Sequence, residues 1–303
     1  MFATKENVAR LSLFSISLLI IIKLVGGFLT GSVSIMADAV HSFIDLSGVV
    51  IGYIGIRVAG KPADEDHAFG HGKAESIAGG IIAGLIFVAA GTIFYQAINR
   101  LVTGGTVELV TVGIYITVAA IVINSAVSWY ALRVSHSTDS IALEATARDM
   151  LADVFSSVAV LVGLILVRLT GLMILDPIVA LIVSVVIART AYITIRKSFA
   201  GLMDTKLPVG EENELASCIE EHIGQLVGYH KVRTRKAGSQ RFIDLHLLLP
   251  RNVSLEEAHQ MCDHLEADII IRLPNSSVTI HVEPCDMECE GCLVVACSLR
   301  QEK

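Results

Sequence analysis

The sequence has few charged and aromatic residues, and its first 217 residues contain no cysteine. Only 17% of the 303 residues are Asp, Glu, Lys or Arg, only 6% are aromatic, and a single Trp is present. A typical soluble domain carries about 25% charged residues, so this composition excludes an ordinary soluble protein. The sequence also lacks a basic stripe, which argues against nucleic acid as a partner.

All the cysteines lie in the more polar C-terminal part, which we expect in the reducing cytosol, where disulfides are rare. They are therefore expected to be thiols or metal ligands. The last four have the spacing C-x3-C-x2-C-x4-C, which permits a thiolate site for a soft metal, an iron–sulfur cluster or an unliganded tail of reduced thiols. The six cysteines are Cys218, Cys262, Cys285, Cys289, Cys292 and Cys297.

Long apolar segments fill residues 1–200, and 53% of all residues are hydrophobic. A helix of roughly 20 apolar residues can cross a bilayer. The sequence predicts six transmembrane helices, at about 9–29, 33–57, 76–98, 109–132, 141–168 and 172–195. Lys and Arg gather before the first span and after the second, fourth and sixth. By the positive-inside rule, this predicts a multi-pass inner-membrane protein with both termini in the cytoplasm.

Ionisable residues occur as pairs inside two predicted spans. His41 and Asp45 lie four residues apart in "MADAVHSFIDLSG", and Asp149 and Asp153 have the same spacing in "ATARDMLADVFSS". Residues at i and i+4 share one helical face, and ionisable groups at membrane depth usually mark function. Two such helices packed together would bring one imidazole and three carboxylates to a tetrahedral cation site.

A structural interpretation stays open for these groups, which could form buried polar clusters with Lys23 or Arg148. Asp38, one turn before His41, either belongs to the site or orients the imidazole as a hydrogen-bond partner. Lys23 is expected to be structural, and Asn124 is expected to hold helices together.

A second candidate cluster lies in "ADEDHAFGHGKAES", between the second and third spans. Asp64, His67 and His71 have spacings of three and four, so a short helical or turn-like loop could bring them onto one cation. Surface loops also contain such histidine pairs by chance. A surface loop without a metal site therefore stays open as the alternative.

The polar region of residues 208–284 is predicted to form a small α+β domain. Its patterns indicate helix, strand, strand, helix and strand at about 211–225, 230–236, 242–249, 254–271 and 277–283. Alternating residues in "RFIDLHLLL" and "SVTIHVE" are typical of half-buried strands. This αββαβ order is ferredoxin-like. Residues 285–303 are then a cysteine-containing tail.

Histidines from several elements of this domain, with one carboxylate, form a third candidate metal site. A single histidine on a strand is usually only a satisfied polar residue, but several with a carboxylate in a small domain favour metal. The candidate ligands are His230, His246, His259, His281 and Glu283.

Together these segments resemble the cation diffusion facilitators, and especially bacterial zinc transporters of that family. The resemblance runs from "GSVSIMAD" through "PADEDHAFGHGKAES" and "LMDTKLP" to "RTRKAGSQRFIDLHL" and "VTIHVEPC". It implies a homodimer that exports divalent metal from the cytoplasm in exchange for protons, by alternating access. It also implies the three metal sites described above, and a dimer-stabilising salt bridge between Lys73 and Asp204.

The chain departs from its zinc-transporting relatives at several positions. They carry Asp where His41 stands and His where Asp149 stands, so the two ligand types are exchanged. Glu283 replaces a usual Asp, and the four-cysteine extension is not a general feature of the family. We therefore expect Zn²⁺ as the cation, with Fe²⁺, Cd²⁺, Mn²⁺ or Co²⁺ as alternatives.

Two other functions compete with proton-coupled efflux. A membrane scaffold that senses cytosolic metal without much transport is the first alternative, and the ligands within the spans argue against it. An intramembrane metalloenzyme is the second, but no nucleophile or general base is poised beside the site. We therefore predict a secondary transporter and not an enzyme, with Zn²⁺ or another divalent metal as substrate and as a structural or regulatory ion.

Overall fold

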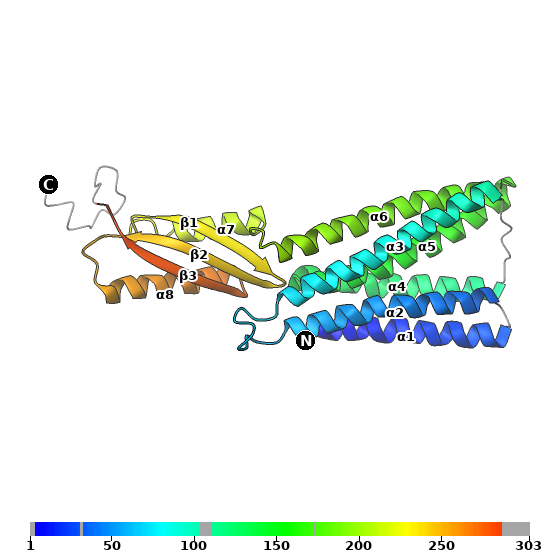
Figure 1. Cartoon of the computed structure of the whole chain (residues 1–303), viewed down its shortest axis with the longest axis horizontal. Helices are drawn as coiled ribbons and strands as arrows, with labels where there is room; N and C mark the ends of the chain where they lie inside the picture. Colours follow the sequence, from blue (N-terminus) through cyan, green and yellow to red (C-terminus); the bar gives the residue numbers. More distant parts are fainter. Residues whose placement is uncertain (1–3, 31–32, 104–110, 173, 287–303) are drawn as a thin grey trace. The chain divides into compact units, whose positions relative to one another are not determined.

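The computed structural model describes residues 4–30, 33–103, 111–172 and 174–286 (Figure 1). The chain divides into two compact units, Met1–Leu202 and Met203–Lys303. Each unit is described by itself.

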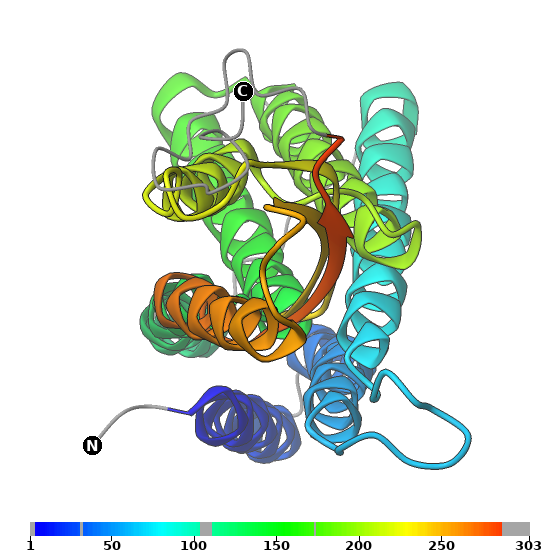
Figure 2. The same cartoon turned by 90° about the vertical axis from the view of Figure 1, so that its left-hand side faces the viewer.

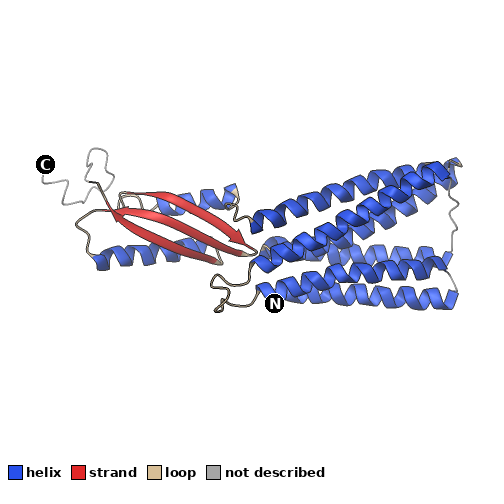
Figure 3. Cartoon of the chain, in the orientation of Figure 1, coloured by secondary structure: helices blue, strands red, loops and turns tan. Residues whose placement is uncertain are grey.

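Long helices make up the first unit, whereas the strands lie in the second (Figure 3). Each helix is longer than the predicted apolar segment to which it corresponds. The helices are α1 (Lys5–Thr30), α2 (Val33–Ala59), α3 (Lys73–Thr103), α4 (Thr111–Thr138), α5 (Ile141–Thr170) and α6 (Leu175–Leu202).

Within the described residues, three segments are long and apolar enough to cross a membrane: Lys73–Thr103, Val118–Thr138 and Pro177–Leu202. They belong to α3, α4 and α6. The other long helices include α2 and α5, which carry the predicted cation ligands. The described part of the first unit thus contains six long helices. That all six cross a membrane stays a prediction.

Small side chains fill the contacts between these helices. Helix α2 packs against α1, α3 and α5, while α5 also packs against α3, α4 and α6. One buried cluster includes Ala78, Ala131, Ala142 and Ala147. Alanine lets helix backbones approach closely, which is how helices associate in lipid, where apolar burial alone gives little driving force.

The second unit has the predicted element order αββαβ. Its elements are α7 (Val209–Glu220), β1 (Gly228–Ala237), β2 (Gln240–Leu249), α8 (Leu255–Arg272) and β3 (Ser276–Pro284). Helix α7 ends five residues before its predicted end at residue 225. The chain turns there and passes Gly224, whose φ of 116° is open to glycine but strained for other residues.

The three strands form one sheet in the order β1-β2-β3, with β1 antiparallel and β3 parallel to β2. Alternate residues of β2 are buried, from Ile243 to Leu249. These side chains join Leu215 and Ile219 of α7 and Leu265 of α8 in one core. Both helices therefore cover the same face of the sheet (Figure 2), and His246 lies on the other face.

Local sequence features define the edges of this domain. Gly238 has a φ of 61° at the first position of the two-residue turn between β1 and β2, where a type II′ hairpin prefers glycine. Ser254 caps α8: its Oγ accepts a hydrogen bond from the Glu257 amide at 3.2 Å, and its own amide donates to the Glu257 side chain at 2.9 Å. This reciprocal pair is a capping box.

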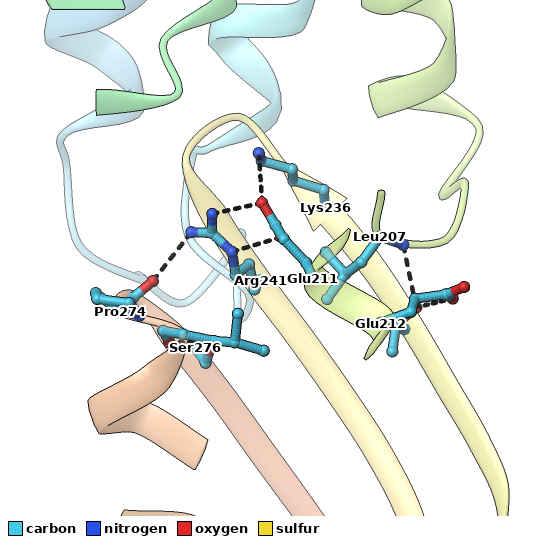
Figure 4. A network of polar contacts seen from close by, with 9 residues as sticks. Leu207, Glu211, Glu212, Lys236, Arg241, Pro274 and Ser276 are labelled. Atoms are coloured by element: carbon cyan, nitrogen blue, oxygen red, sulfur yellow. Dashed lines mark hydrogen bonds and ion pairs between the residues drawn. The ribbon is translucent and has the colours of Figure 1, made fainter. Parts of the chain in front are cut away.

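An arginine joins three segments at one end of the domain (Figure 4). The Arg241 guanidinium donates to both carboxylate oxygens of Glu211 at 2.8 Å and to the Pro274 carbonyl oxygen at 3.0 Å. Arg241 is buried, and a bidentate, charge-assisted pair is among the stronger hydrogen-bonding arrangements. It ties α7 and the turn before β3 to the middle strand.

Candidate functional site

The three acidic residues predicted as cation ligands line one cavity in the first unit. Asp45 of α2 and Asp149 and Asp153 of α5 all contribute to a space of about 480 Å³. Ser42, Asn124 and Gln96 also line it. Helices α2 and α5 thus both contribute carboxylate residues to the lining of one cavity, while binding of a cation by these residues stays a prediction.

Glycines on α2 allow α5 to approach at this cavity. A Cβ atom at Gly48 would lie 2.9 Å from Oδ2 of Asp149, and one at Gly52 would lie 2.1 Å from Oγ1 of Thr146. Real Cβ atoms do not occupy such positions, so any larger residue would displace its neighbour. The two glycines have the G-x-x-x-G spacing of closely packed membrane helices. That spacing is a sequence signal for this contact, although the contact was not predicted.

The remaining predicted ligand, His41, lies within α2 one turn before Asp45, but its side chain is outside the described residues. The side chains of Asp38 and Lys23 are also outside the described residues. Within the described part of the chain, the oxygens of the three carboxylates do not form a group within 4.8 Å. Arg148, a suggested structural partner of the aspartates, donates to Glu144 at 2.7 Å and 3.0 Å.

Asn124 was expected to hold helices together, and that role stays a prediction. Its side chain is buried, it lines the same cavity, and its Oδ1 atom has no hydrogen-bond partner among the described residues. A buried amide oxygen without a partner is energetically costly. It is also a good ligand for a divalent cation, so Asn124 becomes a candidate for the transport site.

The loop between α2 and α3 brings its three predicted ligands together. Asp64 Oδ1 lies 3.0 Å from His67 Nδ1, and Asp64 Oδ2 lies 3.3 Å from His71 Nε2. The His67 amide also donates to Asp64 Oδ1 at 2.7 Å. Desolvation of the carboxylate is outweighed by the hydrogen bonds from His67 and the charge of His71, so the pKa of Asp64 is lowered. The loop here is a turn and not a helix.

In the second unit, histidines form a row across the uncovered face of the sheet. His230 of β1 and His281 of β3 are the direct register partners of His246 on β2. The ring centroids are 5.4 Å apart for His230 and His246, and 4.7 Å apart for His246 and His281. Strand pairing alone therefore places three imidazoles side by side.

Glu283 lies against this row and joins His230 and His246 in one potential metal-binding group. Its oxygens lie 2.6 Å from His246 Nδ1 and 2.9 Å from His230 Nε2. The hydrogen bond from His246 is the main reason that the pKa of Glu283 falls to about 2, against an opposing desolvation. The carboxylate therefore stays ionised and available to a cation. We call His230, His246, His281 and Glu283 the sheet-face cluster.

A β-bulge next to His230 interrupts the pairing of β1 with β2. Lys231 sits in it with a φ of 49°, which is unusual for a residue other than glycine. Its Nζ lies 3.6 Å from Glu283 Oε1. Bulges often change the direction of a side chain beside a functional site, and this one places the ammonium group of Lys231 near the Glu283 carboxylate.

The other predicted ligands lie elsewhere. His259 is on α8, with Nδ1 3.7 Å from Asp263 Oδ1, and it is not in the group formed by His230, His246 and Glu283. Cys285 is partly exposed, and Cys289, Cys292 and Cys297 lie outside the described residues.

The predicted salt bridge would join Lys73 in the first unit to Asp204 in the second, so it stays a prediction. Asp204 itself accepts a hydrogen bond from Arg235 at 3.3 Å.

A further group of ligand-type side chains was not predicted. His222, His264 and Asp268 have ligand atoms that all lie within 4.8 Å of one another. The i,i+4 spacing of His264 and Asp268 was visible in the sequence. His222 fell inside the predicted helix 211–225. The structure ends α7 at Glu220, so His222 lies beyond the helix.

Comparison with known proteins covers nearly all of the chain. A family profile described as the cation efflux transmembrane domain matches residues 9–203, and one described as the cytoplasmic domain of cation efflux proteins matches residues 207–285. An uncharacterized transporter of Synechocystis sp. is 36% identical over 256 residues, which cover 84% of this chain and 83% of the relative.

The cation-efflux pump FieF of Cronobacter sakazakii is 35% identical over 273 residues, covering 89% of this chain and 90% of the pump. Among solved structures, a domain of CzrB, described as a proposed zinc transporter, is 36% identical with a TM-score of 0.26. It covers 26% of this chain and 98% of that domain.

Proposed function

This chain belongs to the cation efflux family, and from that premise we propose that it exports divalent metal cations from the cytoplasm in exchange for protons. The observation that carries the proposal is the shared cavity in the first unit. Three carboxylates from α2 and α5 line it, in a segment that matches the transmembrane domain of the family. Carboxylates that far inside a membrane domain are expensive unless they serve a passing cation.

We propose that the transported ion binds Asp45, Asp149 and Asp153, with His41 as the fourth ligand. Carboxylates and neutral imidazole bind either a metal ion or protons, and binding of one releases the other. If the cavity opens alternately to the two sides of the membrane, protons that enter from outside displace the metal there. The same groups would then carry protons inward, which couples the two flows.

Zn²⁺ is the proposed first substrate, because it ranks high in affinity among first-row divalent metals for nitrogen and oxygen ligands. Three carboxylates with one imidazole are nevertheless a harder ligand set than two of each. Fe²⁺, Mn²⁺, Co²⁺ and Cd²⁺ are therefore proposed competitors. Asn124, if it turns its amide oxygen to the ion, would make the set harder still.

The sheet-face cluster is proposed as a second, regulatory metal site at a homodimer contact. Its ligands lie on the sheet face that α7 and α8 leave uncovered, which is the face available to a second copy of the chain. We also propose that the membrane domain lies in the inner membrane with both termini in the cytoplasm. Metal at the sheet-face cluster would then report the cytosolic metal level.

The test is metal flux in proteoliposomes with an imposed pH gradient, using Zn²⁺ and a metal-sensitive dye. Asp45→Ala and Asp153→Ala are expected to abolish flux while the protein elutes from size exclusion like the wild type. Glu6→Gln is the matched control, since it removes a carboxylate from α1 that pairs with Arg10 outside the cavity.

Wild-type flux in either aspartate variant would remove that residue from the transport site. A wild-type protein that binds Zn²⁺ through its cytoplasmic domain but carries none across the membrane would favour the scaffold alternative.

A further inference from the structure

The helical side of the cytoplasmic domain carries a group of side chains that the proposed transport and sheet-face sites do not use. His222 follows the end of α7, and His264 and Asp268 lie one turn apart on α8. Their ligand atoms lie within 4.8 Å of one another. Because α7 and α8 cover the opposite sheet face from His246, no ion could contact this group and the sheet-face cluster together.

His222 is held in one orientation inside the domain. Its side chain is 8% exposed, and its Nδ1 lies 2.9 Å from the carbonyl oxygen of Cys218. A carbonyl oxygen only accepts, so Nδ1 carries the proton. The other nitrogen, Nε2, then faces Asp268 Oδ2 at 3.1 Å. In the neutral ring Nε2 is an acceptor, and two acceptors at this distance require a cation between them.

That cation is either a proton on Nε2 or a metal ion, and the position of His264 favours the metal ion. Its Nε2 lies 3.7 Å from the same oxygen of Asp268, and its ring meets that of His222 edge-on at 5.3 Å. A proton on His222 joins only that histidine to Asp268, and His264 would then need its own Nε2–H to face the same oxygen. A metal ion takes both nitrogens and the oxygen at once.

The distances suit a small tetrahedral ion. With metal–ligand bonds of about 2.0–2.1 Å, neighbouring ligands of tetrahedral Zn²⁺ lie about 3.3 Å apart. The observed separations of 3.1 Å and 3.7 Å from Asp268 to the two histidines lie on either side of that value.

The nearest arginine on α8 pairs with another carboxylate, while Asp268 faces the two histidines. Arg272, one turn further along α8, forms an ion pair with Glu221. Glu221 immediately precedes His222, and Arg272 neutralises its charge. Asp268 is therefore the carboxylate that faces the two imidazoles.

We propose that His222, His264 and Asp268 form an additional divalent-metal site, which binds Zn²⁺ or a similar borderline ion within one protomer. Two imidazoles and one carboxylate are a donor set that suits such ions, and water would fill the fourth position. His264 is 63% exposed at its side chain, so the ion exchanges with solvent. Bound metal would fasten the end of α7 to α8.

The experiment measures Zn²⁺ binding to the detergent-solubilised full chain by equilibrium dialysis, at free Zn²⁺ that saturates the wild type. His264→Gln changes an exposed side chain and should not disturb folding, whereas His222 is buried. We expect His264→Gln and Asp268→Asn each to lower the stoichiometry by one ion per chain. Asp263→Asn is the matched control on the same helix, since its side chain is 63% exposed, and it should bind as the wild type does.

Hydrogen–deuterium exchange on the same samples gives a local readout. In the wild type, Zn²⁺ should slow exchange at residues 221–226 and at the end of α8, and His264→Gln should abolish that protection while protection of the sheet remains. If His264→Gln keeps the wild-type stoichiometry and protection, the group is a protonated histidine paired with aspartate, and the proposal is wrong. This result would leave the proposed transport site untouched.

Discussion

The transmembrane cavity and the sheet-face cluster gather similar ligands by different means. In the cavity, α2 supplies Asp45 and α5 supplies Asp149 and Asp153 at a spacing of four, and Gly48 and Gly52 allow those helices to approach. On the sheet, three strands each supply one histidine, and register alone aligns them. A helical site therefore depends on packing between elements, whereas a sheet site depends on hydrogen-bond pairing. We expect the first to tolerate added volume poorly and the second to tolerate it well.

The largest effect is expected from Gly52→Ala. Its Cβ would lie 2.1 Å from Oγ1 of the buried Thr146, so α2 and α5 must separate. Overpacking of this kind costs about 1–3 kcal/mol. We expect a clear loss of thermal stability in detergent and of Zn²⁺ flux.

Gly84→Ala is the control for that variant, because nothing lies within 4 Å of a Cβ there. It should retain stability and flux. If Gly52→Ala were as stable and active as Gly84→Ala, the close approach of α2 and α5 would not be what builds the cavity.

Gly48→Ala should act on metal binding more than on folding. The atom it would meet is Oδ2 of Asp149, at 2.9 Å, and this carboxylate can rotate away more easily than the β-branched side chain of Thr146 can. We expect Zn²⁺ to bind the transport site about tenfold more weakly, which corresponds to about 1.4 kcal/mol. Isothermal titration with a thermal-melt control measures both quantities. Unchanged affinity would mean that Asp149 does not bind the ion from this position.

Asp149→His should change selectivity by a smaller factor. A second imidazole makes the ligand set softer, which favours Zn²⁺ over Mn²⁺, and Gly48 leaves space beside the new ring. We expect the ratio of Zn²⁺ to Mn²⁺ flux to rise several-fold in competition assays. A ratio that stays at the wild-type value would show that ligand softness at this position does not set selectivity.

The smallest effect concerns Glu283 in the metal-free protein. Its pKa of about 2 lies below the ordinary value of 4.5, so the folded state favours the ionised form. Its stabilising contribution is complete above about pH 4.5 and is lost as the pH falls toward 2. Glu283→Gln should therefore lower the melting temperature at pH 7, and the difference from the wild type should shrink at pH 3. A difference that grew on acidification would contradict this assignment.

Spacing along one helix made it predictable that Asp149 and Asp153 line one cavity, because the i,i+4 rule places them on one face before any tertiary structure is known. The αββαβ order followed in the same way from the alternation within β2. Register between strands is a tertiary property, so residue spacing could not show that His230, His246 and His281 form a row. The sequence grouped these three with His259 and Glu283 only because all lie in one small domain, and His259 is not in the group that the structure forms with His230, His246 and Glu283.

Two other features escaped prediction for local reasons. Helix α7 ends at Glu220 because the chain turns through Gly224, and a helical pattern that continues past the true end hides the turn. His222 consequently appeared to be a helical residue rather than a partner of α8. Asn124 was predicted to link helices, because sequence alone cannot show that it lines a cavity and that its buried oxygen has no hydrogen-bond partner among the described residues.

The crossover through α8 has a consequence for how the protein is made. Glu283 contacts His230 across 53 positions of the chain, and the whole of α8 lies in the sequence between the parallel strands β2 and β3. Parallel pairings that close such long loops form late in folding. We therefore expect the nascent domain to lack an intact sheet-face cluster until folding is nearly complete, which would keep an unfinished chain from capturing metal there in competition with other cytosolic proteins.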